Sequence, residues 1–471
     1  MNSRRLALRG MSLGLRWVLI LTCLSAKGLV YALPQSEGQG QPSAQAQHAE
    51  TPAGLIPIPD YSGDFWRREY LTGGWGGTRA DLANRGVQFD VLWTQYVQGV
   101  ADGGRDRTTQ YGGALDYVLT LDLMRMKLVP GALVNIRAET RYGESVNGAS
   151  GSILPVNTDL SFPLTNELDE NVPIAITDLN YTQFLSEHFG VVLGKLETLS
   201  GDLNEFASVR GTSQFQNANF VFNATLALRL PYSTLGGGLI WMPKPADENG
   251  GITVTSMLFN TADSSTTSGF DDFGEGATWN TEADFQYRAG TLPGGTNLGV
   301  LYSFDQDFSK LDSRLIFQPG LGFSIPKENS TWAVYASNWQ YLFTEASANK
   351  PIDLREGRAH EQGLGFFTRV GIADKTTNPV DFAVSGGIGG RGLVPSRDDD
   401  TFGLGYFYND IEESRFVSTV GAESSAQGFE CFYEFSITPA CHLALDAQVV
   451  ESALSSIDTA IIFGVRLAMK L

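Results

Sequence analysis

Residues 87–98 read VQFDVLWTQYVQ, and apolar and polar side chains alternate along them. One set of alternate positions is apolar: Val87, Phe89, Val91, Trp93 and Val97. The positions between them are mostly polar: Gln88, Asp90, Thr94 and Gln98. Because successive side chains of a β-strand point to opposite sides, this two-residue period predicts a strand with one apolar and one polar face.

The same period returns along most of the chain, most clearly at residues 115–123, 132–141 and 461–471. About eighteen such segments follow one another between Gly, Asn, Asp and Pro turns. Those at 220–230 and 313–323 are the weakest and are loop candidates. No helical crossover pattern separates the segments, so the sheet is predicted to be antiparallel. One short helix is predicted over Thr78–Arg85, ended by Gly86.

Two architectures satisfy this alternation, namely several soluble β-sandwiches or one membrane β-barrel. Sandwich domains run to about 100 residues, whereas here about 380 residues continue without a linker. Many segments have about ten residues, enough to cross a bilayer at a tilt, and the chain ends on an alternating segment. Aromatic residues recur near segment ends, as at Trp75, Trp93, Trp241, Trp279, Tyr341 and Tyr433. The pattern favours an all-β fold, a transmembrane antiparallel barrel.

The composition agrees with a β-rich chain and narrows its function. Among 471 residues there are 53 Gly, 28 Phe, 16 Tyr and 8 Trp, and charged residues make up 18%. The mean hydropathy of −0.09 excludes a helical membrane protein, which needs several apolar runs of about 20 residues. The net charge of −19, with no basic cluster beyond the extreme N-terminus, argues against a nucleic-acid partner.

The first 32 residues are predicted to be a secretory signal peptide. A basic start with Arg4, Arg5 and Arg9 precedes an apolar run over residues 17–24, and Val30-Tyr31-Ala32 supplies a cleavage site. Removing this segment takes away five positive charges and leaves a mature chain of charge −24. Residues 33–60 are rich in Gln, Ala, Ser, Gly and Pro and are predicted to be a linker.

Several other sequence features look like sites but have simpler structural interpretations. Cys431 and Cys441 are interpreted as small hydrophobic residues, because a turn at Thr438-Pro439 would set Cys431 opposite a residue near 446. Residues 387–392 (GIGGRG) satisfy a GxGxxG pattern, but LVP follows, so they are interpreted as a turn. The four His residues lack ligand spacing, and Asp398–Asp400 is interpreted as a solvated loop rather than a calcium site. No metal or cofactor is predicted.

Arg137, Glu139 and Arg141 are spaced by two residues, so they project from one face of one strand. Facing lipid, each Arg near the midplane would cost about 2–4 kcal/mol, so the triplet is predicted to line the lumen. Alternating charges offer paired donors and an acceptor that match vicinal sugar hydroxyls. The alternative is a structural ladder of ion pairs that stiffens the wall.

Other candidates for the lumen are less specific. Lys195 and Glu197 are interpreted as a similar inward pair, serving either as pore lining or as wall support. Asn157 and Asp159 lie in a long loop, 143–173, that could fold into the channel, as could 199–219. Tyr335 and Trp339 share one face of a segment whose other face carries Trp332 and Val334, and the pattern leaves open which face meets lipid.

Several stretches resemble the carbohydrate-selective porins of the OprB type. They are LTGGWGGTR (71–79) with Leu82 and RGV (85–87), RAETRYGES (137–145) with LPVNTD (154–159), YTQFL (181–185) with GKLE (194–197) and GDLNEF (201–206), and RDDDT (397–401) with GLG (403–405). The resemblance covers about residues 61–471 and keeps its order. The chain departs from the family's pattern at Leu471, where a Phe is usual, in the region 307–360, and at Ala444-Leu445-Asp446, where a proline is expected.

The resemblance implies a single 16-stranded outer-membrane barrel whose loops fold inward, and passive diffusion of mono- and oligosaccharides. It also implies that the strand of Arg137, Glu139 and Arg141 carries the constriction charges. The implied setting is the outer membrane of a Gram-negative bacterium, with lipid around the barrel and a homo-oligomer as one possible state. The hypothesis is a sugar-preferring porin. Its rivals are a general or cation-preferring porin, a barrel lipase or protease for which His442 has no nameable partner, and a soluble carbohydrate-binding protein.

Overall fold

The computed structural model describes residues 54–161, 172–198, 202, 204–227, 229–247, 250–263, 265–270, 274–311, 316–318, 322–345, 361–411 and 424–471. The predicted signal peptide and linker residues 33–53 lie outside the described residues. Residues 54–60, the end of the predicted linker, are described and pack against the rest of the protein, with Leu55 and Ile56 buried.

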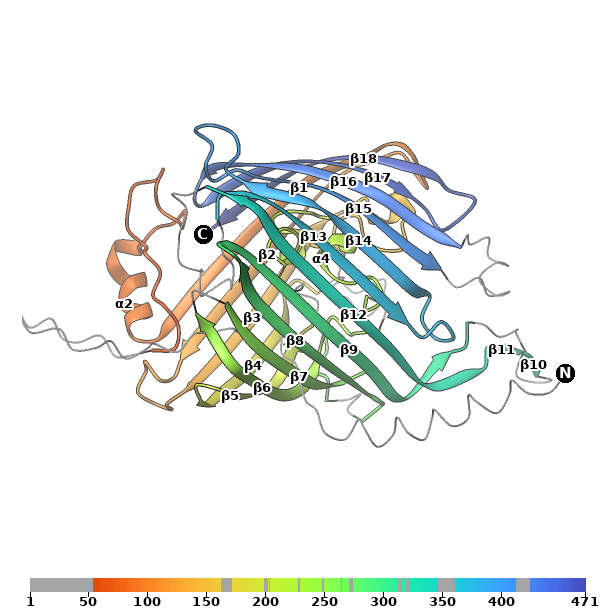
Figure 1. Ribbon diagram of the computed structural model, residues 1–471, viewed down its shortest axis with the longest axis horizontal. Coiled ribbons are helices and arrows are strands. Elements are labelled where there is room, and N and C mark those ends of the chain that lie inside the picture. Colours follow the sequence, from red (N-terminus) through yellow and green to blue (C-terminus); the bar gives the residue numbers. More distant parts are fainter. Residues whose placement is uncertain are drawn as a thin grey trace, which may run out of the picture.

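Sixteen antiparallel strands close into one barrel, as predicted (Figure 1). The wall strands are β1(Val87–Gly104), β2(Thr109–Asp122), β3(Ala132–Gly143), β4(Ala175–Ser186), β5(Phe189–Glu197), β6(Ser233–Asp247), β7(Gly250–Asn260), β8(Ala277–Ala289), β9(Leu292–Ser309), β12(Lys327–Thr344), β13(Gly363–Ala373), β14(Val380–Arg391), β15(Thr401–Ile411), β16(Ser425–Thr438), β17(Cys441–Glu451) and β18(Asp458–Lys470). Neighbours in the wall follow sequence order, and β1 pairs with β18 through Trp93 opposite Met469.

The two weak segments are not part of the wall. Residues 220–230 hold the end of the short helix α4(Ala218–Val221) and turns. Within 313–323, β10(Ile316–Gln318) pairs only with β11(Gly322–Ser324), in a hairpin between β9 and β12. Sixteen strands therefore form the barrel wall, whereas roughly eighteen segments alternate in the sequence.

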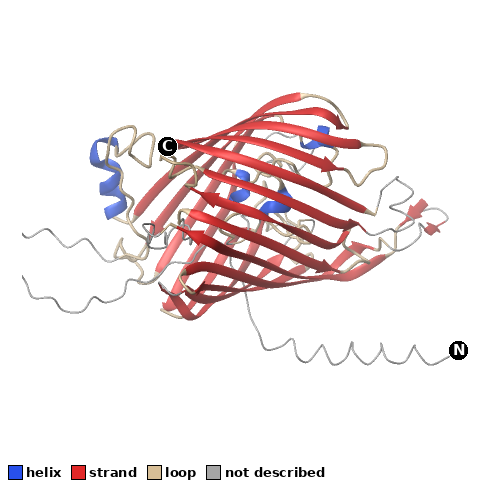
Figure 2. Cartoon of the chain, turned by 45° about the horizontal axis from the view of Figure 1, so that its top comes forward, coloured by secondary structure: helices blue, strands red, loops and turns tan. Residues whose placement is uncertain are grey.

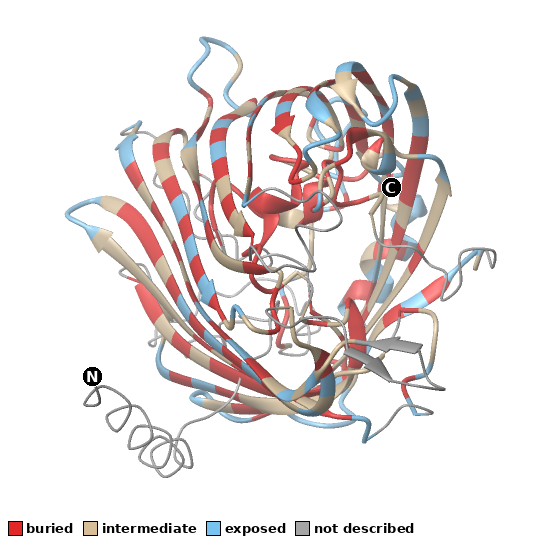
Figure 3. Cartoon of the chain, turned by 90° about the vertical axis from the view of Figure 1, so that its right-hand side faces the viewer, coloured by how far each residue is buried: buried red, intermediate tan, exposed pale blue. Residues whose placement is uncertain are grey.

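Burial alternates along the strands, because one face of each strand meets the filled lumen and the other faces outward (Figure 3). The outward face carries apolar side chains such as Leu193, which is 68% exposed among the described residues. Such a band is what a hydrocarbon environment requires. In β12, Trp332 and Val334 are exposed on this face while Tyr335 and Trp339 are buried inside, which settles the orientation that the sequence leaves open.

The outward face also holds both cysteines. Cys431 lies opposite Ala447, close to the predicted position, and alternates along β16 with buried Glu430 and Phe432. Cys431 and Cys441 are both free thiols, in agreement with their interpretation as small hydrophobic residues.

The predicted N-terminal helix is present as η1(Trp75–Gly77) and α2(Thr78–Asn84), and it lies outside one end of the barrel, near the C-terminus (Figure 1). Buried Arg79 holds it in place. Its guanidinium carbon lies 4.7 Å from the ring of Tyr61, 4.1 Å from Tyr70 and 4.9 Å from Trp75. Its Nη2 pairs with Asp90 of β1 at 3.0 Å, so cation–π contacts and an ion pair fix the helix to the barrel.

The interpretation of residues 387–392 as a turn is wrong. Residues 387–391 belong to β14, which runs straight on to Arg391. A Cβ added at Gly389 would lie 2.8 Å from the side chain of Phe206. The glycines therefore leave space for a segment inside the barrel rather than reverse the chain.

Candidate functional site

The lumen is occupied by chain residues between β5 and β6 rather than being an empty cylinder. Residues 202–232, with 203 and 228 outside the description, carry η2(Val209–Gly211) and α4 and form what we call the inward segment (Figure 2). Phe215 and Phe220 of this segment are completely buried. This agrees with the prediction that loop 199–219 folds into the channel, with residues 199–201 outside the description.

Aromatic rings attach the inward segment to one side of the wall. The ring centroid of Phe215 lies 5.3 Å from that of Phe367 in β13 and 4.9 Å from that of Phe432 in β16. That of Phe220 lies 5.8 Å from that of Phe407 in β15. These separations are typical of favourable aromatic pairs.

Wall glycines make room for these rings. A Cβ added at Gly403 would lie 2.7 Å from the ring of Phe215, and one at Gly405 would lie 2.6 Å from that of Phe220. Real Cβ atoms do not approach so closely, so the absence of side chains forms a recess. We call Gly365, Gly389, Gly403 and Gly405 the glycine recess.

Charged wall residues reinforce the same side. Arg369 of β13 is almost fully buried and donates to Asp202 at 2.8 Å, to the carbonyl of Phe220 at 2.7 Å and to that of Ala207. Glu430 of β16 accepts the backbone N–H groups of Gln216 at 2.5 Å and Asn217 at 2.9 Å.

Arg466 of β18 adds a further tether. It donates to the carbonyl of Gly211 at 2.7 Å and that of Gln214 at 3.0 Å, and it pairs with Glu434 at 2.6 Å. The wall thus satisfies backbone groups of the inward segment that would otherwise need water.

The loop between β3 and β4 also enters the barrel in its described part, which includes α3(Asn147–Ser150). Asn157 and Asp159 are both 0% exposed. Asn157 donates to Gln98 of β1 at 2.8 Å, and Asp159 accepts from Thr94 at 2.6 Å and Tyr96 at 2.8 Å. The predicted residues therefore face the interior, held by polar groups of β1.

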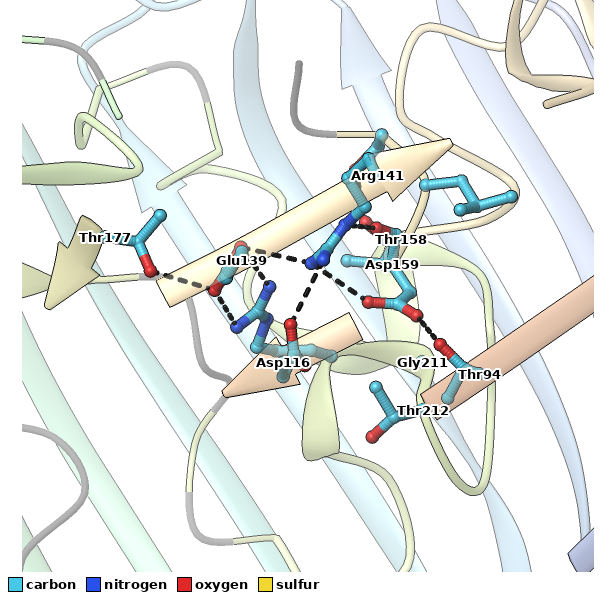
Figure 4. A network of polar contacts seen from close by, with 12 residues as sticks. Thr94, Asp116, Glu139, Arg141, Thr158, Asp159, Thr177, Gly211 and Thr212 are labelled. Atoms are coloured by element: carbon cyan, nitrogen blue, oxygen red, sulfur yellow. Dashed lines mark hydrogen bonds and ion pairs between the residues drawn. The ribbon is translucent and has the colours of Figure 1, made fainter. Parts of the chain in front are cut away.

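Arg141 of β3 is the centre of an ion-pair network (Figure 4). Its guanidinium lies 3.1 Å from Asp116 of β2, 3.1 Å from Glu139 and 3.2 Å from Asp159. The side chain of Arg141 is 10% exposed and that of Glu139 is 0% exposed. The network joins the wall to the β3–β4 loop.

Glu139 extends this network to the inward segment. It receives two hydrogen bonds from Arg210, at 2.8 and 3.2 Å, and one from Tyr232 at 2.7 Å. Thr177 of β4 donates to it at 3.0 Å. The β3–β4 loop and the inward segment, which both fill the lumen, thus meet at β3, the strand that carries the charged triplet.

Arg137 differs from the other two members of the triplet. Its side chain is 29% exposed, and its Nη1 lies 3.7 Å from Glu197. At this distance the ion pair leaves guanidinium N–H groups for other acceptors. Arg137 is therefore the member of the triplet that meets open space.

The structure separates Lys195 from Glu197. Lys195 lies two residues after exposed Leu193 in β5 and opposite exposed Leu179, so it shares their outward face. It donates to the carbonyls of Ser265 at 3.1 Å and Thr267. It anchors the connection between β7 and β8. Only Glu197 joins the triplet, through Arg137, so the prediction of an inward pair is wrong for Lys195.

Residues 398–400 were predicted to be a solvated loop, and this prediction is wrong for Asp400, whereas Asp398 and Asp399 are exposed. Asp400 is 3% exposed and accepts from Arg397 at 2.8 Å, from Tyr433 at 2.8 Å and from the N–H of Ser436 at 2.9 Å. Burial raises its pKa, but these hydrogen bonds outweigh burial and hold the pKa below the usual value. Within the described ranges, no three His, Cys, Asp or Glu side chains gather as a metal site would need.

A cavity of about 490 Å³ lies where the inward segment rejoins the wall. Its lining combines polar residues, among them Arg229, Asp263, Asp307 and Thr377, with apolar residues such as Phe308. Arg229 lies over the ring of Phe308 at 5.6 Å and donates to the carbonyl of Thr377 at 2.6 Å. The size is ordinary for a small-molecule site.

Sequence reasoning missed the residues through which the inward segment is held, chiefly Arg210, Tyr232, Arg369 and Glu430. Arg369 and Glu430 stand on the inner faces of their strands, so alternation could have placed them in the lumen. Arg210 and Tyr232 lie outside regular strands, where no period marks them.

Among the described residues, no helix combines the length and apolar character needed to cross a bilayer. A comparison with curated proteins found no match. Two solved structures of OprB from Pseudomonas putida share the fold. The high-pH structure has a TM-score of 0.70 at 19% identity, with 87% of this chain and 100% of that chain covered. The low-pH structure has a TM-score of 0.53 at 16% identity, with 86% and 99% covered.

A family model agrees with this architecture and with the resemblance noted in the sequence. The model of the carbohydrate-selective porin, OprB family, matches residues 106–471, which include all wall strands except β1 and the whole charged triplet. The chain therefore belongs to the carbohydrate-selective porin OprB family.

Proposed function

We propose that this protein is a passive diffusion channel for mono- and oligosaccharides in the outer membrane of a Gram-negative bacterium. It reaches that membrane through a cleaved signal peptide, residues 1–32. Transport needs no cofactor, energy source or catalytic step. The observation that carries the proposal is the family match over residues 106–471, together with a barrel whose lumen is narrowed by segments held from several sides.

A narrowed lumen is what selection by solute chemistry requires. A solute that passes close to the wall must exchange part of its water shell for wall groups. The inward segment brings such groups together because it is fixed by backbone hydrogen bonds to Arg369, Glu430 and Arg466. A fixed segment holds donors and acceptors at constant spacing, which a mobile loop would not do.

Within this lumen, Arg137 is proposed to contact sugar directly, and Glu197, whose side chain is 5% exposed, is proposed to position Arg137 as its ion-pair partner. The pair is long at 3.7 Å, and Arg137 is partly exposed, so hydroxyl groups can replace water around it as solute passes. Arg141, Glu139, Asn157 and Asp159 are proposed to shape the constriction from behind, because their side chains are committed to the network and nearly covered. Lys195 is proposed to support the wall.

Liposome swelling with the mature chain tests the proposal. Glucose or small oligosaccharides should enter faster than amino acids of similar size. Entry ordered by size alone would support a general porin instead, and absence of swelling with inserted protein would contradict any channel function.

Two variants separate lining from support. Arg137→Ala should reduce the preference for sugars over amino acids while the size limit stays the same, because only an exposed donor is lost. Arg141→Ala should raise the entry of all solutes, because Asp116, Glu139 and Asp159 lose their common partner and the β3–β4 loop loosens. The opposite pattern would reverse the two roles.

A cation-preferring porin is the second candidate, favoured by the net charge of −19. The reversal potential across a bilayer with a salt gradient distinguishes the two. A strong cation preference that added sugar does not change would favour the second candidate, whereas block of ion current by sugar would favour the first.

A further inference from the structure

Residues Gly54–Pro57 lie inside the barrel, at the end near α2 and the C-terminus. Leu55 and Ile56 are 3% and 4% exposed and form one cluster with Leu133 of β3, Phe184 of β4, and Ile240 and Met242 of β6. These wall residues alternate with outward ones: Leu185, next to Phe184, is 64% exposed, and Trp241, between Ile240 and Met242, is 50% exposed. The cluster is therefore on the inner face of the wall.

This inner face is an apolar surface at the mouth of the channel. Three strands contribute to it at the same end of the barrel, and each contributes large side chains. Left uncovered, these side chains would meet water in the channel mouth. Leu55 and Ile56 supply the cover, so the surface has an occupant from this same chain.

Hydrogen bonds fix the backbone of the occupant to neighbouring strands. The carboxylate of Asp122, at the end of β2, accepts the N–H groups of Leu55 at 2.6 Å and Ile56 at 3.3 Å. Arg125 donates to the carbonyl of Ile56 at 2.8 Å, and Gln88 of β1 donates to that of Pro57 at 2.8 Å. Asp122 is 0% exposed, so these donors and Arg125 take the place of water around its carboxylate.

We propose that Gly54–Pro57 is a strap that docks on this inner surface and narrows the channel mouth next to α2. Release of the strap widens the mouth. Its contacts with the described residues involve β1–β4, β6 and the β2–β3 turn, and none of them is a pairing between wall strands, so the strap can leave while the wall stays closed. Residues 58–60 tie it to Tyr61, which packs with Arg79 outside the barrel. A released strap therefore stays attached to the protein and can dock again.

Single-channel conductance in potassium chloride tests the strap, with residues 33–471 in planar bilayers. The double variant Leu55→Asp with Ile56→Asp should conduct more than the native chain, because two charges cannot remain on the apolar surface. Trp66→Ala is the matched control, since Trp66 belongs to the same N-terminal region but is 67% exposed, and it should leave the conductance unchanged. Equal conductance of the double variant and the native chain would overturn the proposal.

Both variants must first show the heat-dependent gel migration of a folded barrel, so that failure to fold is recognised. Conductance of small ions does not depend on sugar preference. A failed strap test therefore leaves the proposed function standing, and a failed sugar test leaves the strap standing.

A cysteine probe gives a second measurement. With Cys431→Ala and Cys441→Ala as background, Ile56→Cys should react with a charged methanethiosulfonate reagent much more slowly than Trp66→Cys. Its modification should raise the conductance, and a reductant should restore the original value. Reaction as fast as at Trp66→Cys, or modification with no change in conductance, would contradict docking in the mouth.

Discussion

The inward segment meets two walls of different chemistry. Towards β3 and β4, Glu139 holds it through Arg210 and Tyr232, in a network that also includes Arg141. Towards β13–β16, phenylalanine rings fill the glycine recess. Both sides are buried. The first side depends on charge pairing and hydrogen bonds, whereas the second adds the fit of rings to glycines to its charged contacts from Arg369 and Glu430.

The two attachments differ in how they fail. A buried ion network becomes costly when one partner is lost, because the remaining charges have no water to replace it. A recess fails when its volume changes, since rings and glycines fit only in combination. The polar side is therefore expected to be the more sensitive to single substitutions, although it has fewer contacts between large side chains.

The largest effect is expected at Glu139. Glu139→Ala leaves Arg141 and Arg210 without their shared acceptor and should lower the free energy of unfolding by about 3–5 kcal/mol. Urea unfolding in detergent, followed by tryptophan fluorescence, measures this change.

Asp102→Ala is the matched control, because Asp102 pairs with Arg107 at the surface, where both side chains are more than half exposed. It should change the free energy of unfolding by less than about 1 kcal/mol. If both variants behaved alike, burial of the network would not matter and the comparison between the walls would collapse.

A smaller effect is expected in the glycine recess. Gly405→Ala places a methyl group against the ring of Phe220 and should cost about 1–3 kcal/mol of stability. The same unfolding experiment measures this change. The ion conductance measured without sugar should also change, because the inward segment shifts. Gly148→Ala is the control, since a Cβ there meets nothing within 4 Å. Full tolerance of Gly405→Ala would mean that the recess is loose.

The smallest effect is expected at Asp400, in the turn before β15, where an ion pair lies near the surface. Its carboxylate has a lowered pKa, so the stabilisation is present above the unfolded pKa, about 3.9, and is lost as the pH falls through the folded value. Asp400→Asn should therefore lower the melting temperature at pH 7. The difference from the native chain should shrink as the solution is acidified below pH of about 4. A difference that stays constant with pH would exclude the charge of Asp400 as its source.

The strands were predictable because most of them have an apolar outer face and a more polar inner face, which gives a two-residue period. That pattern indicated β3 and its charged triplet directly, and it left the 313–323 region weak because β10 and β11 do not cross. The roles within the triplet were not predictable. Arg137 and Arg141 lie on the same face of β3 at regular spacing. The β3–β4 loop and the inward segment cover the network around Arg141 and leave Arg137 partly open.

The filling of the lumen was less accessible to the sequence. Phe215 and Phe220 lie in a segment without a period, and their partners are glycines, whose lack of a side chain leaves no hydrophobic signal. The GIGGRG stretch was misinterpreted for the same reason, since a glycine kept for space looks like a glycine kept for a turn. The prediction for Lys195 was wrong because a charge on the outer face is unexpected. The sequence does not show that the connection between β7 and β8 accepts its hydrogen bonds.

The pairing of β1 with β18 has a consequence for biogenesis. Residues 92–104 of β1 pair with residues 458–470 of β18, so the two strands that seal the wall are its first and last to be made. Until the final strand is available, both edges of the sheet expose unpaired backbone groups that can recruit other chains. Closure across so long a sequence separation is also a slow step. The cell must therefore protect the nearly complete chain from aggregation until its last thirteen-residue strand is in place.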